Sequence, residues 1–382
     1  MTGIRQKTGY IWAFLIAFLP RLFWSLQAIP LRTVSDELST MNGAVFFSSQ
    51  NWNAVVSKAG YYGFGMSILA TPLMQWIKDP VILYRTLLVC TGVLESVAAV
   101  ICFYLIKRVF GITDEKKALL MTVTISYITV VRTTVFYNEH MLISWCICLV
   151  LAKLVLTEEP KKRAMWTGFF VLLMLYALTV HARTTTYIFA AVLVIALYGF
   201  MYRKKMVSLS VFGILTAGGY LLIKKGTKIY QSVVWSTTEG VGNTRVNIGQ
   251  EKLSLLKTAD GIKACLFTIF GQINIASMIS GGLLITALVM VILLIVRKGK
   301  EAFVLKTIQA DNAQERLYFV IGSFFVLCTG MTIAAQSLTW IATAANALAD
   351  GYGAKQYGTK AFTYLRYMMP YLQPLLMLVF VT

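Results

Sequence analysis

The chain has 382 residues, of which 58% are hydrophobic and 13% charged, and its mean hydropathy is +0.70. A soluble globular chain carries about 25% charged residues, so this composition excludes that class and indicates a protein that crosses a membrane several times. Lys and Arg in short loops between apolar segments explain much of the formal net charge of +19, with anionic lipid phosphates as a second partner. No basic patch carries an RNA- or DNA-binding motif, so nucleic acid is not an expected partner.

Apolar segments long enough to span a bilayer recur along the whole chain. A span needs about 20 mostly apolar residues, and by this criterion we expect roughly ten spans. The expected spans cover residues 10–29, 81–106, 118–136, 140–157, 165–181, 185–202, 206–223, 277–296, 317–338 and 364–382. The sequence therefore predicts an all-α, polytopic transmembrane helical bundle that forms a single domain over residues 1–382.

Basic residues gather in alternate loops, which sets the expected orientation in the membrane. These clusters are Arg5/Lys7, Lys107/Arg108/Lys116/Lys117, Lys161/Lys162/Arg163, Arg203/Lys204/Lys205 and Arg297/Lys298/Lys300. The positive-inside rule assigns them, and the N-terminus, to the cytoplasmic side of the cell membrane. The long loops 30–80, 224–276 and 339–363 then face outward, so we expect any active site on the extracytoplasmic side.

Two outer loops contain stretches that favour interfacial helices. Tyr61 to Trp76 is apolar but short for a span, and it contains Gly63, Gly65 and Pro72, so it predicts a helix lying at the interface. Leu253 to Phe270 has apolar residues at helical spacing and predicts a short amphipathic helix on the outer leaflet. The chain ends inside an apolar run, so either the last helix ends there or the chain is part of a longer protein.

The first candidate catalytic groups are Asp36 and Glu37, two adjacent carboxylates just after the first span. A carboxylate beside a partly dry cavity binds a proton more tightly and can act as a general base. The alternative is structural: Ser35 or Asp36 would cap a helix from Glu37 to Phe47. The two interpretations are compatible.

Two tight outer turns hold the next candidates. Glu139 and His140 lie between the third and fourth expected spans, and His181 and Arg183 lie in the next outer turn. Ionisable groups at span ends usually face a water-filled cavity or a partner, which favours a functional role for Glu139 and Arg183. For the two histidines, the only two in the chain, we expect a supporting role or that of turn residues at a wet membrane surface.

The last candidates are Tyr364 and Arg366, at the outer end of the final expected span. A guanidinium fork matches phosphate oxygens, so this pair suits binding of a phosphate. An aromatic belt with one Arg is the alternative. Carboxylates together with arginines at a membrane surface suit transfer from a phosphate-bearing lipid, in which a base deprotonates an acceptor hydroxyl and cations stabilise the departing phosphate.

In order and sidedness these motifs resemble the glycosyltransferase C superfamily, in particular the protein O-mannosyltransferases and the aminoarabinose transferase of lipid A. The motifs that carry the resemblance run along most of the chain: Asp36-Glu37, Tyr61 to Pro72, Asn138-Glu139, His181-Ala182-Arg183, and Arg366-Tyr367 followed by Pro370. None is specific alone. In the family a large soluble domain follows the last span; these 382 residues end with the last expected span, which fits a chain that is part of a longer protein.

The resemblance implies that Asp36 is the base or a close helper and that Glu139 is an acidic site near the acceptor. It also implies that Arg183 and Arg366 hold the phosphate of a polyprenyl-phosphate sugar and that transfer inverts the anomeric carbon. The acceptor would be a glycan, lipid or protein of the cell envelope. Some relatives use a divalent metal, but those resembled most are thought not to, so no metal or other cofactor is expected.

Two alternatives use the same features. One is a flippase or secondary transporter for lipid-linked saccharides, although transporters usually carry their ionisable groups near the bilayer midplane in repeated halves. The other is a polymerase of surface polysaccharide, which shares the expectation of chemistry at the outer face.

Overall fold

The structure is a computed structural model of the whole chain. It describes residues 2–28, 41, 43–50, 63–128, 139–180, 184–234, 250–301, 312–342, 344–345 and 353–382. Within these ranges, the side chains of residues 2–7, 139–140, 231, 234, 250–251 and 353–366 are not described.

The described residues form helices and no strands, as the sequence predicts. The helices are α1 (Thr2–Gln27), α4 (Gly65–Trp76), α5 (Pro80–Tyr104), the π-helical turn η2 (Leu105–Val109), α6 (Glu115–Ile128), α7 (Glu139–Leu156), α8 (Pro160–Val180), α9 (Thr185–Tyr202), α10 (Leu209–Val234), α11 (Gln250–Leu255), α12 (Ala259–Ile279), α13 (Leu283–Lys300), α14 (Ala313–Thr339) and α16 (Gly353–Val381).

Six of the described helices are long and apolar enough to cross a membrane. These six segments are Thr8–Gln27, Pro80–Val109, Pro160–Val180, Thr185–Tyr202, Ala259–Ile279 and Ala313–Thr339. Helices α7 and α16 contain shorter apolar segments, Met141–Leu156 and Tyr367–Val381. A multi-pass membrane protein agrees with these helices, whereas the expected number of about ten spans is not confirmed.

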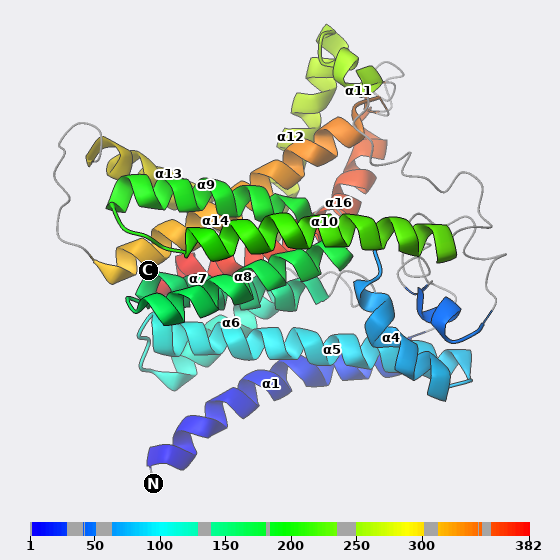
Figure 1. Cartoon of the computed structure of the whole chain (residues 1–382), viewed down its shortest axis with the longest axis horizontal. Coiled ribbons are helices and arrows are strands. Elements are labelled where there is room, and N and C mark those ends of the chain that lie inside the picture. Colours follow the sequence, from blue (N-terminus) through cyan, green and yellow to red (C-terminus); the bar gives the residue numbers. More distant parts are fainter. Residues whose placement is uncertain are drawn as a thin grey trace.

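The long helices lie side by side, with α1 along one edge against α5 and both chain termini toward the same end (Figure 1). Helix α8 packs against α10, α14 packs against α9 and α16, and α7 contacts α5, α8, α14 and α16. Large side chains fill the space between them: Phe103, Trp145, Phe170, Tyr187, Phe319, Phe324 and Phe325 are all fully buried. The apolar side chains on the outside of the bundle, such as Trp24 on α1, suit contact with lipid.

Short polar residues fix where several helices begin. Asp79 accepts hydrogen bonds from the backbone N–H groups of Val81 and Ile82, at 2.8 Å each, and Pro80 occupies the first position of α5. Such caps satisfy N–H groups that have no partner within the helix, and proline is tolerated there because its missing N–H is not needed. Asn312 caps α14 in the same way through the N–H of Gln314.

The segment 277–296 is not one helix, so this expected span is wrong in its bounds. Helix α12 ends at Ile279 and α13 begins at Leu283, after a turn at residues 280–282. Gly281 and Gly282 have φ angles of +59° and +83°, in the left-handed region that glycine adopts without steric cost. The expected short amphipathic helix within Leu253 to Phe270 is likewise replaced by α11 and the longer α12.

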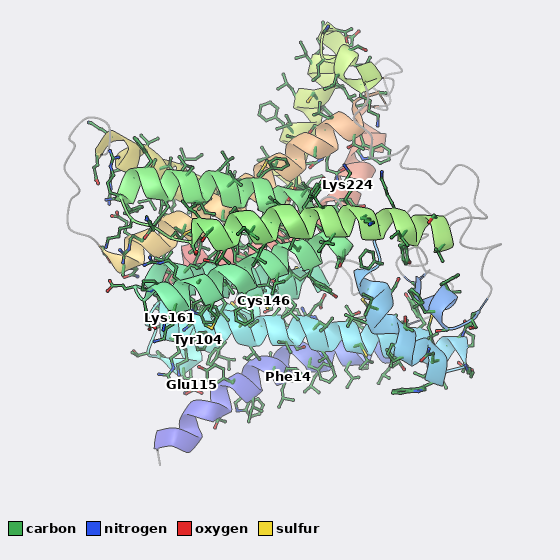
Figure 2. The ribbon with its side chains drawn as sticks, viewed as in Figure 1. Phe14, Tyr104, Glu115, Cys146, Lys161 and Lys224 are labelled. Atoms are coloured by element: carbon green, nitrogen blue, oxygen red, sulfur yellow. The ribbon has the colours of Figure 1, made fainter. Side chains whose placement is uncertain are left out.

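The end of the bundle that holds the termini also gathers the loops with basic clusters, and we call it the basic end. Lys107 pairs with Glu115 at 3.7 Å between η2 and α6. The rings of Phe110 and Tyr318 lie 5.5 Å apart, which joins the end of η2 to the start of α14. Figure 2 shows Tyr104, Glu115 and Lys161 together at this end, with Lys224 of α10 toward the opposite end.

Candidate functional site

The opposite end of the bundle is organised by α4, and we call it the α4 end. The N–H of Phe64, just before α4, donates a hydrogen bond of 2.7 Å to the carbonyl of Thr179, near the end of α8. Gly63 makes this approach possible, because a Cβ on it would lie 2.2 Å from the same carbonyl oxygen. Its φ of +145° also favours glycine. The backbone before α4 is therefore fixed directly on the end of α8.

A second part of the first long loop packs on the same surface. Met41, Ala44 and Val45 form a buried cluster with residues of α4 and of the first turns of α5, and Gln50 donates to the carbonyl of Met74 at 3.4 Å. The ring of Phe64 also lies 5.6 Å from that of Tyr230 in α10. The described parts of the loop between α1 and α5 thus cover the ends of α5, α8 and α10 (Figure 1).

The chain leaves α1 at this end as well. Arg85, in the second turn of α5, donates from Nε to the carbonyl of Ala28 at 3.3 Å. The segment that contains Asp36 and Glu37 lies in sequence between Ala28 and Met41, and both of these flanking residues are at the α4 end. Asp36 and Glu37 themselves lie outside the described residues.

Helices α7, α9 and α16 meet just inside the α4 end through buried polar and aromatic contacts. The hydroxyls of Ser144 and Tyr187 are 2.6 Å apart, and the ring of Tyr187 meets that of Tyr371 edge-on at 5.4 Å between centroids. Trp145 donates from Nε1 to Oε1 of Gln373 at 3.0 Å. These contacts fix the rotation and the register of the three helices relative to one another.

The remaining candidate residues lie four or five positions before these contact residues in the sequence. Ser144 follows Glu139 by five residues, Tyr187 follows Arg183 by four, and Tyr371 follows Arg366 by five. Glu139 and His140 begin α7, and Tyr364 and Arg366 lie in α16, but these four side chains are outside the described part. His181 and Arg183 are also outside it. The roles of all these residues stay predictions.

The structure shows one buried ion pair that the sequence interpretation missed. Arg21 of α1 pairs through Nε with the carboxylate of Glu95 in α5, and both side chains are buried. The Arg21 guanidinium also donates to the carbonyls of Ala17 at 2.6 Å and Ser126 at 3.4 Å, and it lies 5.0 Å from the ring centre of Tyr127. The sequence did contain a signal for this pair, because a charged residue inside an apolar span usually pairs with an opposite charge or belongs to a functional site.

A second charged group lies at the basic end. Lys298 contacts Glu301 at 2.7 Å and Glu315 at 2.5 Å, and Arg297 contacts the same two carboxylates. Burial alone would lower the pKa of Lys298, but the hydrogen bonds and charges of the two glutamates outweigh burial, so its pKa is raised. Two cations and two anions cancel, so this group offers no net charge to a phosphate.

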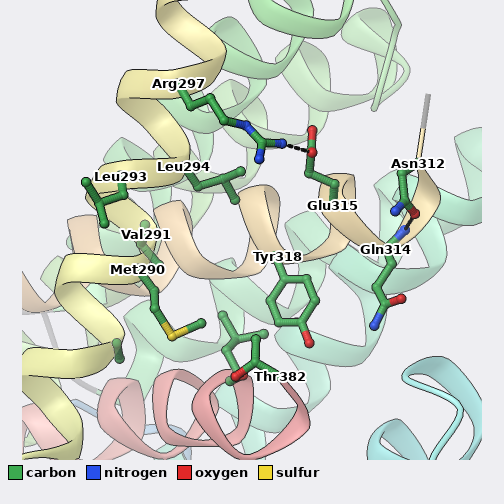
Figure 3. A pocket seen from close by; sticks show the side chains of 12 residues that line it. Met290, Val291, Leu293, Leu294, Arg297, Asn312, Gln314, Glu315, Tyr318 and Thr382 are labelled. Atoms are coloured by element: carbon green, nitrogen blue, oxygen red, sulfur yellow. Dashed lines mark hydrogen bonds and ion pairs between the residues drawn. The ribbon is translucent and has the colours of Figure 1, made fainter. Parts of the chain in front are cut away.

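This group borders a cavity of about 440 Å³ between α13, α14 and α16. Figure 3 shows Met290 and Leu294 on one wall, Tyr318 on another, and the paired Arg297 and Glu315 at the rim. Because its walls are mostly apolar and its rim charges are paired, the cavity suits an apolar group better than an anion.

A metal site is not evident in the part of the chain that the structure describes, where no three His, Cys, Asp or Glu residues lie close enough to hold an ion. The side chains of the predicted acids Asp36, Glu37 and Glu139 lie outside that part. The expectation of no metal therefore stays untested.

Comparisons with known proteins give no match: no family model, no curated protein and no solved structure is similar to this chain.

Proposed function

We propose that the protein is a membrane glycosyltransferase that moves a sugar from a polyprenyl-phosphate donor to an acceptor in the cell envelope, on the extracytoplasmic side. The reaction is the one implied by the resemblance to the glycosyltransferase C superfamily. The acceptor is a glycan, a lipid or a protein.

The observation that carries the proposal is the contact between α7, α9 and α16. Ser144, Tyr187 and Tyr371 hold these helices together. Glu139, Arg183 and Arg366 precede these three residues by four or five positions in the sequence, which supports a shared site for one carboxylate and two arginines. The chain that contains Asp36 and Glu37 begins and ends at the same end of the bundle.

The proposed chemistry uses these groups in one displacement. A carboxylate, Asp36 in the first instance, takes the proton of the acceptor hydroxyl, whose oxygen forms a bond to the anomeric carbon of the sugar. The bond between that carbon and the phosphate oxygen breaks, and the phosphate leaves with the electron pair. Arg183 and Arg366, with Tyr364, neutralise the charge that develops on the phosphate.

The proposed orientation follows from the separation of the two ends of the bundle. Loops rich in Lys and Arg gather at the basic end, which we assign to the cytoplasm by the positive-inside rule. The α4 end then faces outward, where an acceptor of the cell envelope is accessible. The polyprenyl tail stays in the lipid beside the helices.

The test is sugar transfer by the purified protein in liposomes that contain polyprenyl-phosphate sugars. Asp36→Asn is expected to lower the rate by about 100-fold or more, as removal of a general base does, while the protein stays folded. Asp79→Asn is the matched control, because Asp79 is a carboxylate at the same end whose role as a helix cap asparagine can fill. Normal transfer by Asp36→Asn would show that the base assignment is wrong.

A carrier of lipid-linked saccharides is the second candidate function, and the buried pair of Arg21 and Glu95 favours it. Ionisable groups inside transmembrane helices are a common feature of transport pathways. A carrier would move the donor lipid across liposomes without changing it, and Glu95→Gln would stop that movement. Transfer of the sugar to a second lipid-linked saccharide would instead identify a polymerase.

A further inference from the structure

Several buried polar atoms on α12 and α14 have no hydrogen-bond partner. Within the described part of the chain, Gln272 has neither amide atom hydrogen-bonded, and Oε1 of Gln336, Oγ1 of Thr332 and Oγ of Ser277 also have no partner. Their side chains are at least nine-tenths buried, and Gln272 is fully so. We call these four residues the amide seam.

The two glutamines of the amide seam, Gln272 and Gln336, are on α12 and α14, which pack against each other. Ala264 of α12 packs in one buried cluster with Ile341 and Ala344, just after α14. Gln272 is fully buried on α12, which packs mainly against α14 and α16, so we infer that its amide lies against these two helices.

Helix α16 packs against both α12 and α14. A Cβ on Gly322 of α14 would lie 3.4 Å from the side chain of Leu378, which fixes the register of α14 against α16. Because α14 and α16 run antiparallel, ten residues onward from Gly322 and ten residues back from Leu378 bring Thr332 level with the buried Met368. The backbone of Arg366 is two residues further along α16. Thr332 of the amide seam is therefore at the level of the part of α16 that the proposed function assigns to the donor.

Some neighbouring polar residues on the same helices are satisfied, although the hydroxyls of Tyr318 and Ser323, nearer the start of α14, also have no partner. Thr329 and Ser337 of α14 donate to carbonyls of their own helix, each at 2.8 Å. Gln373 of α16 accepts from Trp145. Leaving a buried amide without partners costs free energy, and such groups in a native protein call for a partner that binds there.

The turn between α12 and α13 would allow that partner to enter. Gly281 and Gly282 take left-handed φ angles, and no described atom lies within 4 Å of a Cβ built on either. Helix α12 lies at the edge of the bundle, against α14 and α16 (Figure 1). A small rotation at this turn would move α12 and open the amide seam, with a shift in the contacts that Ile273 and Ala276 make with the core.

We propose that the amide seam binds the neutral, hydroxyl-bearing sugar of the lipid-linked donor, with α12 as a hinged cover; this rests on the proposed function. Amides and hydroxyls each offer donors and acceptors, which match sugar hydroxyls. None of the four residues is charged, so the phosphate of the donor would remain outside the seam, with Arg183 and Arg366.

The test compares the binding of two lipids by the purified protein. One is polyprenyl phosphate that carries glucose, mannose or N-acetylglucosamine, whichever binds best, and the other is the same lipid without sugar. Gln272→Met and Thr332→Val should each weaken binding of the sugar-bearing lipid by about three- to tenfold, which is the loss of one neutral hydrogen bond. Binding of the sugar-free lipid should not change.

The same variants should stabilise the ligand-free protein, which a merely structural role would not do. Gln272→Met removes an unpaired amide, so the Tm should rise, whereas Gln373→Met removes a bonded amide and the Tm should fall. Thr329→Val is the matched control for Thr332→Val, since its hydroxyl is bonded within α14, and it should bind both lipids as the wild type does.

Three results would overturn parts of this account in distinguishable ways. A wild-type protein that binds neither lipid and transfers no sugar contradicts the proposed function. Normal transfer together with unchanged sugar binding in Gln272→Met and Thr332→Val contradicts the amide seam alone. A lower Tm in Gln272→Met would show that water or protein groups already satisfy its amide, which also contradicts the seam as a ligand site.

Discussion

Arg21 and Glu95 are charged side chains on otherwise apolar helices, and their burial ties α1 to α5 and α6. Removing an ion from water costs several kcal/mol, which is recovered only when the partner charge and further hydrogen bonds are in place. Here the carbonyls of Ala17 and Ser126 complete the shell around the guanidinium. The pair therefore fixes the C-terminal half of α1, from which the chain enters the loop with Asp36.

Removing one partner should destabilise the protein far more than removing both. Glu95→Leu leaves the Arg21 charge buried and should lower the free energy of unfolding by about 3–5 kcal/mol. The double variant Arg21→Met/Glu95→Leu should lie close to the wild type. Denaturant unfolding in mixed micelles measures both, and an unchanged Glu95→Leu would contradict the account.

The hydroxyl of Tyr127 supplies a hydrogen bond that α1 lacks at Pro20. Pro20 of α1 has no N–H, so the carbonyl of Ile16 lacks its partner within the helix, and the hydroxyl of Tyr127 donates to it at 2.8 Å. Tyr127→Phe should lower the free energy of unfolding by about 1–2 kcal/mol. The cost should shrink in a Pro20→Ala background, where the helix regains its donor. Equal costs in the two backgrounds would rule this explanation out.

At the scale of the element, α4 depends on one backbone contact with α8. Gly63→Ala should push the start of α4 away from Thr179 and lower sugar transfer by about tenfold or more, because small displacements at a site have large effects on rate. Gly111→Ala is the control: its φ is also positive, but no described atom lies within 4 Å of the added Cβ, and it lies toward the basic end. Equal activities of the two variants would argue against a role for α4.

The length of apolar segments predicted the bounds of some single helices well. The expected segments 140–157 and 185–202 became α7 (Glu139–Leu156) and α9 (Thr185–Tyr202). The prediction of one helix over residues 277–296 was wrong because hydropathy takes no account of backbone conformation. The backbone leaves the helix at Gly281 and Gly282, where φ is positive. A pattern of apolar residues measures burial and not the continuity of the backbone.

At the scale of the whole molecule, the sequence predicted an all-helical membrane protein but not which distant residues meet. Arg21 and Glu95 are 74 positions apart, and Trp145 and Gln373 are 228 apart. Such pairings depend on how the helices pack, which composition and periodicity do not encode. The unpaired amide of Gln272 was invisible for the same reason, since only the fold shows that it is buried.

The proposed orientation makes a direct prediction for labelling in intact cells. In a background without the six native cysteines, Lys78→Cys, between α4 and α5, should react with a membrane-impermeant maleimide. Lys161→Cys, at the basic end, should react only after the membrane is permeabilised, because both side chains are exposed but on opposite sides. The reverse pattern would put the α4 end in the cytoplasm.

The most direct measurement for the central claim is an experimental structure with a polyprenyl-phosphate sugar bound. We predict that the phosphate lies at the α4 end, within hydrogen-bond distance of Arg183 and Arg366, with the sugar between the phosphate and Asp36. A phosphate bound instead at the cavity between α13, α14 and α16, beside Arg297, would contradict the claim.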